Sequence, residues 1–371
     1  MRPLPSLSRR SKVATAMAIA VVTGAFLPGV AAAKSTPFLN TLSMQSVVGT
    51  TVPSNGDINP YGVAVVPKSI GKLVKGDVLV SNFNNGTNAQ GTGTTVVQVS
   101  PKGALTVFAS ITPSDVPMCP GGVGLTTALA VLRSGWVVVG SLPTSDGTSA
   151  TAMAGCLIVL DRTGHVATTI QNGMINGPWD MTALDRGDDP VLFVSNVLNG
   201  TVAANGGVVH RGSVVRIDLS DANSAMPHVT SERVIGSGFA EKTDPGALVI
   251  GPTGLALDEM GNLYVADTLD SRIAVIPDAL TRTSASHRGM TVSQHNHLNQ
   301  PLGLALAPNG NILAVNAADG NAVEITPTGH QVAVRLLDSV GAGTLFGLAV
   351  APHGDGLYFV DDGSNNLQLL H

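Results

Sequence analysis

Three segments in the last third of the chain share one pattern. PTGLALDEMGNLYVADTLDSRIAVI (252–276) is followed by PLGLALAPNGNILAVNAADGNAVEI (301–325) and by LFGLAVAPHGDGLYFVDDGSNNLQLL (345–370). Each copy has an apolar run after a Pro-x-Gly-like step, a turn, a second apolar run that ends in Asp or Asn, and a third alternating run. Repetition of this kind predicts one supersecondary unit per copy, because a single unit cannot bury its own faces and several stacked units can.

Three looser copies precede these segments. The Pro-x-Gly-like steps align at residues 60–62, 126–128, 178–180, 252–254, 301–303 and 345–347. The second runs end at Asn82, Ser141, Asn196, Asp267, Asn316 and Asp361. Further runs at 104–110, 166–171 and 331–337 supply a fourth strand per copy. The chain therefore contains six predicted antiparallel units of four strands.

Six such units arranged in a circle predict an all-β fold, a six-bladed β-propeller, which leaves only short and protected sheet edges. The last copy reaches His371 after its third run, so its fourth strand has to come from elsewhere. The apolar segment around residues 44–48 precedes the first copy and is suited to that place. We expect this N-terminal strand to close the ring, with residues 34–371 forming one domain.

The first 33 residues read as a secretory signal peptide. Four basic residues in MRPLPSLSRRSK precede an apolar run and the small residues Ala31-Ala32-Ala33, which is the order of a cleaved signal. An uncleaved membrane anchor is the alternative, since the run is just long enough to span a bilayer. Cleavage predicts an extracytoplasmic protein, periplasmic or secreted, with no membrane span in its mature part.

Charge and cysteine content narrow the class further. Removing the four basic residues of the signal from 20 Lys and Arg leaves 16, against 25 Asp and Glu, a net charge of −9. A chain this acidic has no basic surface for nucleic acid. Its two cysteines, Cys119 and Cys156, favour a single disulfide in an exported protein, with two free thiols as the alternative. We expect a monomer.

The repeated segment resembles the NHL repeat, most clearly in copies four to six. More distantly, the chain is similar to the six-bladed propellers of the gluconolactonase and senescence-marker family, whose calcium ligands are Asn, Asp and Glu at the starts of the inner strands. This chain has Thr, Leu and aromatic residues there, and Asp180 is the one carboxylate among them. The resemblance therefore implies the fold without the metal ligands, and we expect no metal. The resemblance does not indicate a cofactor.

The middle residues of the Pro-x-Gly-like steps predict a ring around the mouth of the central channel. They are Tyr61, Thr127, Trp179, Thr253, Leu302 and Phe346. Three aromatic residues in six positions, beside the carboxylate of Asp180, are suited to an apolar pocket or to a platform for a sugar ring. The alternative is that these side chains only fill the top of the channel as core.

His295 and His297 precede an inner strand on the same side and are two residues apart, so they share one face of an extended segment. No third metal-binding partner accompanies them. The Asn, Asp and Ser residues at the ends of the second runs are interpreted as turn-forming residues, since such side chains bond the backbone of the next loop.

The predicted function is that of a binding or interaction module for a small molecule, a glycan or a protein. Its predicted ligand-binding residues are Tyr61, Trp179, Asp180, His295, His297 and Phe346. The alternative is a metal-dependent hydrolase, lactonase-like, or a lyase with its site at the same mouth. No catalytic residue is identified, because the sequence contains no nucleophile elbow, zinc-protease motif or phosphate loop.

Overall fold

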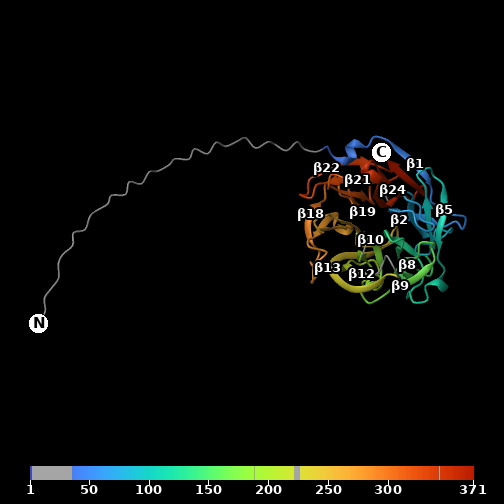
Figure 1. Cartoon of the computed structure of the whole chain (residues 1–371), viewed down its shortest axis with the longest axis horizontal. Coiled ribbons are helices and arrows are strands. Elements are labelled where there is room, and N and C mark those ends of the chain that lie inside the picture. Colours follow the sequence, from blue (N-terminus) through green and yellow to red (C-terminus); the bar gives the residue numbers. More distant parts are fainter. Residues whose placement is uncertain (2–35, 188, 221–225, 342) are drawn as a thin grey trace. The chain divides into compact units, whose positions relative to one another are not determined.

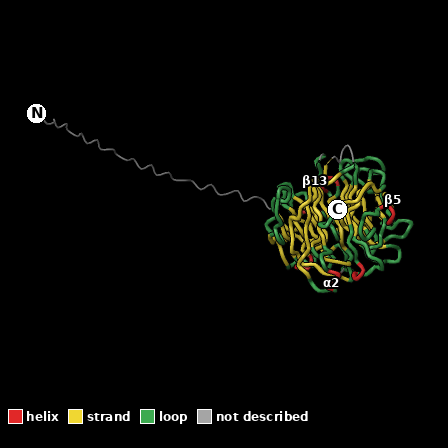
Figure 2. The backbone as a smooth tube through the Cα atoms, turned by 90° about the horizontal axis from the view of Figure 1, so that it is seen from below, coloured by secondary structure: helices red, strands yellow, loops and turns green. Residues whose placement is uncertain are grey.

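The structure is a computed structural model that describes residues 1, 36–187, 189–220, 226–341 and 343–371. All but the first residue of the predicted signal segment, 1–33, lies outside the described residues. The folded body comprises Thr36–His371. Six sheets are arranged around one axis, with the inner strands β2, β10 and β19 near the centre and β5, β9, β18 and β22 towards the rim (Figure 1). Figure 2 shows the same strands from the side, with loops and turns gathered at both of their ends.

The blades follow the repeats. Blade one comprises β2 (Ile58–Val65), β3 (Val78–Asn84), β4 (Thr95–Val99) and β5 (Leu105–Ser110). Blade two comprises β6 (Leu125–Val131), β7 (Val137–Ser141), β8 (Cys156–Leu160) and β9 (Val166–Ile170). Blade three comprises β10 (Pro178–Leu184), β11 (Val191–Asn196), β12 (Val209–Ser220), β13 (His228–Asp244) and β14 (Leu248–Ile250).

The second half of the chain is more regular. Blade four comprises β15 (Pro252–Leu257), β16 (Leu263–Asp267), β17 (Arg272–Ile276) and β18 (Met290–Gln294). Blade five comprises β19 (Pro301–Leu306), β20 (Ile312–Asn316), β21 (Asn321–Ile325) and β22 (Gln331–Leu336). Blade six comprises β23 (Leu345–Val350), β24 (Leu357–Asp361), β25 (Asn366–Leu370) and the N-terminal β1 (Gln45–Thr50).

Helices are short and lie in the segments that precede or connect the strands. The α-helices are α1 (Phe38–Thr41) and α2 (Thr201–Ala204). Single 3-10 turns are found at Pro113–Asp115, Ser149–Thr151, Thr268–Asp270 and Pro352–Gly354. None of the helices in the described ranges is long and apolar enough to cross a membrane.

The ring closes as predicted. β1 pairs antiparallel with β25, so that Gln45 lies opposite Leu370 and Thr50 opposite Asn366. The first and last strands of the body thereby complete one sheet, which leaves no unfinished blade. The expected segment, residues 44–48, overlaps most of the observed strand.

Two details of the predicted blades are wrong. The second strand of blade one ends at Asn84, two residues beyond Asn82, because the backbone of Ile58 still pairs with Asn84. Blade three has five strands instead of four, since β12 and β13 are 12 and 17 residues long and β13 turns back into β14. Their pairing extends from Ser220 opposite His228 to Val209 opposite Glu241.

The second-strand ends make structural contacts, but only some bond the following loop as expected. Asp361 accepts the N–H of Ser364 in the next turn at 3.1 Å. Asp267 instead accepts hydrogen bonds from the guanidinium of Arg272 in β17 at 3.0 and 2.6 Å, and Asn316 donates through Nδ2 to the carbonyl of His297, in the segment before its blade, at 2.7 Å.

Glycine follows the middle position of the Pro-x-Gly-like step in four blades, at Gly62, Gly254, Gly303 and Gly347. A Cβ built on Gly303 would lie 2.1 Å from the carbonyl oxygen of Phe346 in the next blade, and one built on Gly347 would lie 2.2 Å from that of Tyr61. These glycines permit the inner strands to approach backbone to backbone. The narrow axial channel of the propeller depends on this approach.

Candidate functional site

The two faces of the propeller carry different loops. The mouth face is the one at which the inner strands begin and the second strands end. The strand-end face is the opposite one, at which the inner strands end. The hairpin that joins β13 to β14 reaches over the axis on the mouth face. We refer to residues Asp244–Ile250, which include β14, as the lid.

The lid covers the aromatic side chains that the sequence analysis placed around the mouth of the channel. Tyr61, Trp179 and Phe346 are 2%, 3% and 1% exposed, and Leu248 and Val249 of the lid belong to the same apolar cluster. The ring centroids of Tyr61 and Phe346 are 3.9 Å apart in a stacked arrangement. The expected aromatic surface is thus filled core, as in the packing alternative, because the lid removes it from solvent.

Polar contacts hold the lid in place from three sides. The indole Nε1 of Trp179 donates to the carbonyl of Val249 at 3.0 Å. Gln90, in the loop between β3 and β4, donates to the carbonyl of Pro245 at 2.7 Å, and the hydroxyl of Ser149 donates to that of Asp244 at 3.2 Å. The lid therefore depends on blades one and two although it belongs to blade three.

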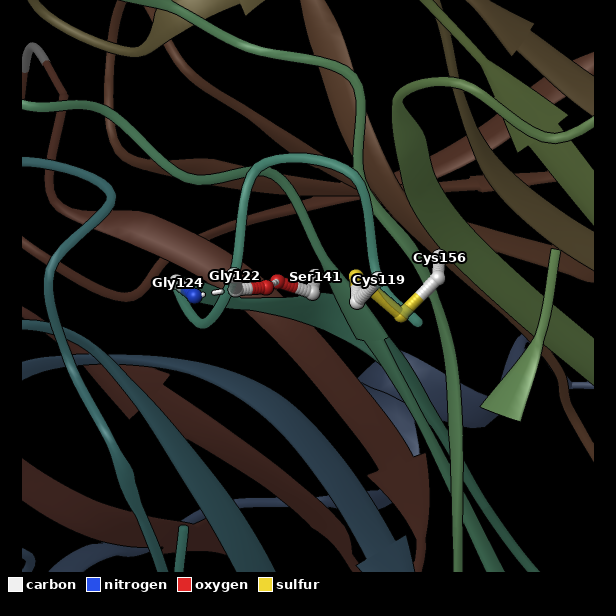
Figure 3. The surroundings of a disulfide bond; sticks show 5 residues. All are labelled: Cys119, Gly122, Gly124, Ser141 and Cys156. Atoms are coloured by element: carbon white, nitrogen blue, oxygen red, sulfur yellow. Dashed lines mark hydrogen bonds between the residues drawn. A yellow bond between two sulfur atoms is a disulfide. The ribbon is translucent and has the colours of Figure 1, made fainter. Parts of the chain in front are cut away.

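A disulfide fastens the neighbouring part of the mouth face (Figure 3). Cys119 and Cys156 are joined across 37 residues of sequence, with their Cα atoms 5.4 Å apart. Beside them, the hydroxyl of Ser141 accepts the N–H of Gly124 at 3.0 Å and donates to the carbonyl of Gly122 at 2.9 Å. The segment before β6 is thereby fixed to β7 and β8, next to the loop that carries Ser149.

The mouth face retains a cavity of about 360 Å³ between the lid and blades six and one, which we call the polar cavity. It is lined by Ile58, Asn59, Asn84, Asn88, Gln90, Gly246, Asp362, Gly363 and Asn365. Most of these residues come from the start of β2, the end of β3 and the loop after β24, which lie side by side because β2 and β23 are neighbouring inner strands. None of these described lining residues is Lys or Arg.

Three amide oxygens of the polar cavity have no hydrogen-bond donor among the described residues: Asn59 Oδ1, Asn84 Oδ1 and Gln90 Oε1. The amide nitrogens of Asn84 and Gln90 are used within the protein, by Asn88 Oδ1 at 2.6 Å and by the lid. Asn59 and Asn84 are 7% and 2% exposed. Buried acceptors without donors are costly, and all three belong to residues that line this cavity.

The electrostatics of the cavity are negative. Burial, together with repulsion from Asp361 and Asp338, raises the pKa of Asp362 to about 7. Burial also raises the pKa of the Tyr61 hydroxyl well above its ordinary value, and Asp362 and Asp244 add to the rise. A neutral or cationic donor therefore suits the cavity better than an anion.

A second cavity of about 310 Å³ adjoins the polar cavity, since Gly246 lines both. Its walls include the apolar side chains of Ile250, Leu302 and Phe346 together with Thr268 and Gln300. The two cavities are neighbours on the mouth face, with Gly246 of the lid between them.

The two predicted histidines lie apart from this site. His295 and His297 are exposed in the turn between β18 and β19, and neither lines a cavity described above. Their backbones shape the turn, since the N–H of His295 donates to the carbonyl of Ser271 and that of His297 to Gln331 Oε1. Within the described residues, no three or more His, Cys, Asp and Glu side chains gather in a manner suited to a metal ion.

Asp180 faces away from the aromatic side chains with which the sequence analysis grouped it. Successive side chains of a strand point in opposite directions, so Trp179 packs beneath the lid while Asp180 lines a separate cavity along the axis. Its carboxylate accepts the N–H of Leu255 in blade four at 3.0 Å. Burial raises the pKa of Asp180 to about 7.

The sequence analysis missed the acceptors of the polar cavity. Asn84 and Gln90 fall within the insertion at residues 84–94, and Asn59 precedes Pro60 of the first Pro-x-Gly-like step. The insertion itself was a usable signal, because loops on a rigid scaffold frequently carry binding residues. The pairing of this loop with the lid is not visible in the repeat pattern.

Comparison with solved structures places the chain among six-bladed propellers. It is similar to a gluconolactonase from Xanthomonas campestris (TM-score 0.54, 13% identity, 88% of each chain covered). It is similar to a luciferin-regenerating enzyme (TM-score 0.54, 14% identity, 88% of this chain and 95% of that one). A calcium-binding regucalcin from Agrobacterium tumefaciens is also similar (TM-score 0.52, 14% identity, 87% and 93% covered).

At such identities the likeness shows the fold alone, since one fold supports many functions. No family model matches the chain, so membership of the NHL family stays a prediction. No curated protein is similar to it at a significant level. The function therefore has to be inferred from the geometry of the candidate site.

Proposed function

We propose that this propeller is a binding module for a small, hydroxyl-rich molecule of the monosaccharide type, held in the polar cavity. The observation that supports it is that three residues lining one cavity, Asn59, Asn84 and Gln90, each have an amide oxygen without a donor in the described residues. Sugar hydroxyls donate to such acceptors. The carboxylate of Asp362 supplies a further, stronger acceptor.

The size of the cavity separates this ligand from a bare cation. About 360 Å³ lies in the usual range for small-molecule pockets, roughly 300 to 1,000 Å³. A calcium ion needs its oxygen ligands within about 2.6 Å, which would leave most of the space unused. The adjoining cavity beside Leu302 and Ile250 offers room for an apolar substituent on the sugar.

The test is calorimetric titration of a panel of neutral monosaccharides and their methyl glycosides. Asn84→Ala and Asp362→Asn should each weaken binding at least tenfold, because each removes an acceptor or a charge from the cavity. Asp355→Asn, an exposed carboxylate outside the cavity, is the matched control and should change nothing. Failure of every sugar to bind, or equal binding by all three variants, would refute the proposal.

The metal-dependent hydrolase or lyase alternative makes a different prediction. If a metal is required at the mouth, EDTA lowers the melting temperature and one ion restores it, since a ligand specific to the folded state stabilises it by mass action. A melting temperature unchanged by EDTA, with sugar binding intact, is the result expected for the binding module.

We also propose that the protein works outside the cytoplasm. The disulfide Cys119–Cys156 and the signal-like residues 1–33 support this location. Mass determination of the protein from its host should give a chain that begins at Lys34 with no free thiol. A full-length, reduced chain would contradict it.

A further inference from the structure

Basic residues are unevenly distributed over the surface of the propeller. Of the 16 Lys and Arg that follow the predicted signal, five lie on the strand-end face of blades one and two. Lys68, Lys72 and Lys75 lie in the loop between β2 and β3, Arg133 between β6 and β7, and Arg162 between β8 and β9. All five are exposed, and we refer to them as the basic patch.

Contacts between the three loops bring the basic patch together. The N–H of Lys72 donates to the carbonyl of Arg162 at 2.8 Å. Gly135 lies in the turn that carries Arg133, and a Cβ built on it would be 2.7 Å from Cγ2 of Ile70 and 3.2 Å from Cβ of Arg162. The five residues therefore form one surface although three separate segments supply them. The negative net charge of the chain hides this surface.

The positive charge of the basic patch is not neutralised by ion pairs. Within the described residues, none of its five side chains pairs with a carboxylate. Three carboxylates occur in or beside the same loops, and they are used inside the protein. Asp77 is 8% exposed, Asp161 accepts two N–H groups of its own turn, and Asp185 accepts the N–H of Arg133.

Other parts of the surface have the opposite charge. The mouth face carries Asp244 of the lid together with Asp338 and Asp362, and the polar cavity there is lined by no described Lys or Arg. On the strand-end face, blades four and six expose Glu259 and Asp355 in the turns after their inner strands. An anionic surface therefore attracts the basic patch and repels the mouth face, which sets the orientation of the molecule on approach.

The shape of the basic patch suits a planar partner. None of its described residues lines a cavity mentioned above, so it is a protruding surface and not a groove. Gln98 of β4 holds the loop from below, since its amide accepts the N–H of Val74 and donates to the carbonyl of Lys72, each at 3.3 Å. Val74 itself is 48% exposed between Lys72 and Lys75. An apolar side chain among lysines is typical of a surface that meets lipid headgroups.

From these observations we propose that the basic patch is a docking surface for an anionic lipid bilayer. The lipid phosphates pair with the Lys and Arg side chains, and Val74 contacts the headgroup layer. In this orientation the mouth face and its polar cavity point away from the membrane. The proposal does not depend on sugar binding, so either proposal can fail without the other.

The test is cosedimentation of the protein with vesicles of phosphatidylcholine alone and of phosphatidylcholine mixed with phosphatidylglycerol. The protein should bind the mixed vesicles at least tenfold more tightly, and added salt should release it, because salt screens the attraction. Lys72→Glu combined with Lys75→Glu should weaken this binding at least tenfold. Arg233→Glu combined with Arg335→Glu is the matched control, since it changes the net charge equally on β13 and β22, outside the basic patch, and it should retain the binding.

Three results would overturn the proposal. They are equal binding to both kinds of vesicle, undiminished binding by the Lys72→Glu, Lys75→Glu variant, and binding to dextran sulfate without binding to the mixed vesicles, which would indicate a soluble polyanion as the partner. If that variant does not fold, Lys68→Glu combined with Arg162→Glu serves instead, because both side chains are exposed. Unchanged binding by this second variant would likewise refute the docking surface.

Discussion

The buried carboxyl of Asp180 makes the stability of this propeller depend on pH in a direction opposite to that of most carboxylates. Its pKa is about 7 in the folded protein against 3.8 for the free side chain, because burial disfavours the charge. Between these two pH values the folded state binds the proton more tightly than the unfolded state. Asp180 therefore stabilises the fold below about pH 4, and this contribution is lost as the pH rises through about 7.

The magnitude follows from the difference between the two pKa values, about 3. At 1.36 kcal/mol for each pH unit, the full effect is on the order of 4 kcal/mol, of which roughly 2 to 3 kcal/mol falls between pH 5 and pH 8. Asp180→Asn keeps an acceptor for the Leu255 N–H and removes the titration. The free energy of unfolding of the variant should therefore decline less between these pH values, by that amount.

Urea denaturation followed by circular dichroism at pH 5, 6, 7 and 8 measures this difference. Asp362 and Glu241, whose pKa values burial also raises to about 7, contribute a residual decline in both proteins. Asp355→Asn is the control, since this exposed side chain should leave the profile of the wild type unchanged. If Asp180→Asn declines as steeply as the wild type, the carboxyl of Asp180 does not carry a raised pKa and the reasoning is wrong.

Three further predictions concern stability. Replacing both Cys119 and Cys156 by Ser should lower the free energy of unfolding by about 4 kcal/mol, the loop entropy of a 37-residue link, and the urea midpoint under non-reducing conditions measures it; equal midpoints would contradict a stabilising disulfide. Gly303→Ala should lower the free energy of unfolding by about 3 kcal/mol or more, because the new Cβ would collide with the Phe346 carbonyl. Gly173→Ala is the control and should be nearly neutral in the same urea denaturation experiment, because a Cβ there meets nothing within 4 Å. Trp179→Phe should lower the free energy of unfolding by about 1 to 3 kcal/mol, because the Val249 carbonyl loses its donor. In a Trp136→Phe background, the fluorescence emission of Trp179 should be blue-shifted and should resist quenching by acrylamide, because the side chain is buried. Strong quenching would mean that the lid does not cover Trp179.

Much of the architecture could be predicted from the sequence, because strand formation and turn formation depend on neighbouring residues. The six aligned copies predicted the number of blades, and the truncated last copy predicted closure by an N-terminal strand. The six sheets confirm the first prediction, and the pairing of Gln45 with Leu370 confirms the second. The fifth strand of blade three was missed, since β12 and β13 depart from the repeat that defined the other blades.

The candidate site depended on contacts between distant parts of the chain. The sequence predicted that Tyr61 and Trp179 lie together at the channel mouth, but it did not show whether they form an exposed surface or a buried core. The lid decides this, because it covers them. The lid residue Val249, whose carbonyl accepts the indole N–H, is 70 residues after Trp179 in the chain. Likewise, Asn59, Asn84 and Asp362 line one cavity only because blade six lies beside blade one in the closed ring. Local periodicity sets strands and turns, whereas burial, pKa values and cavities arise from packing between blades, and only the tertiary structure contains that packing.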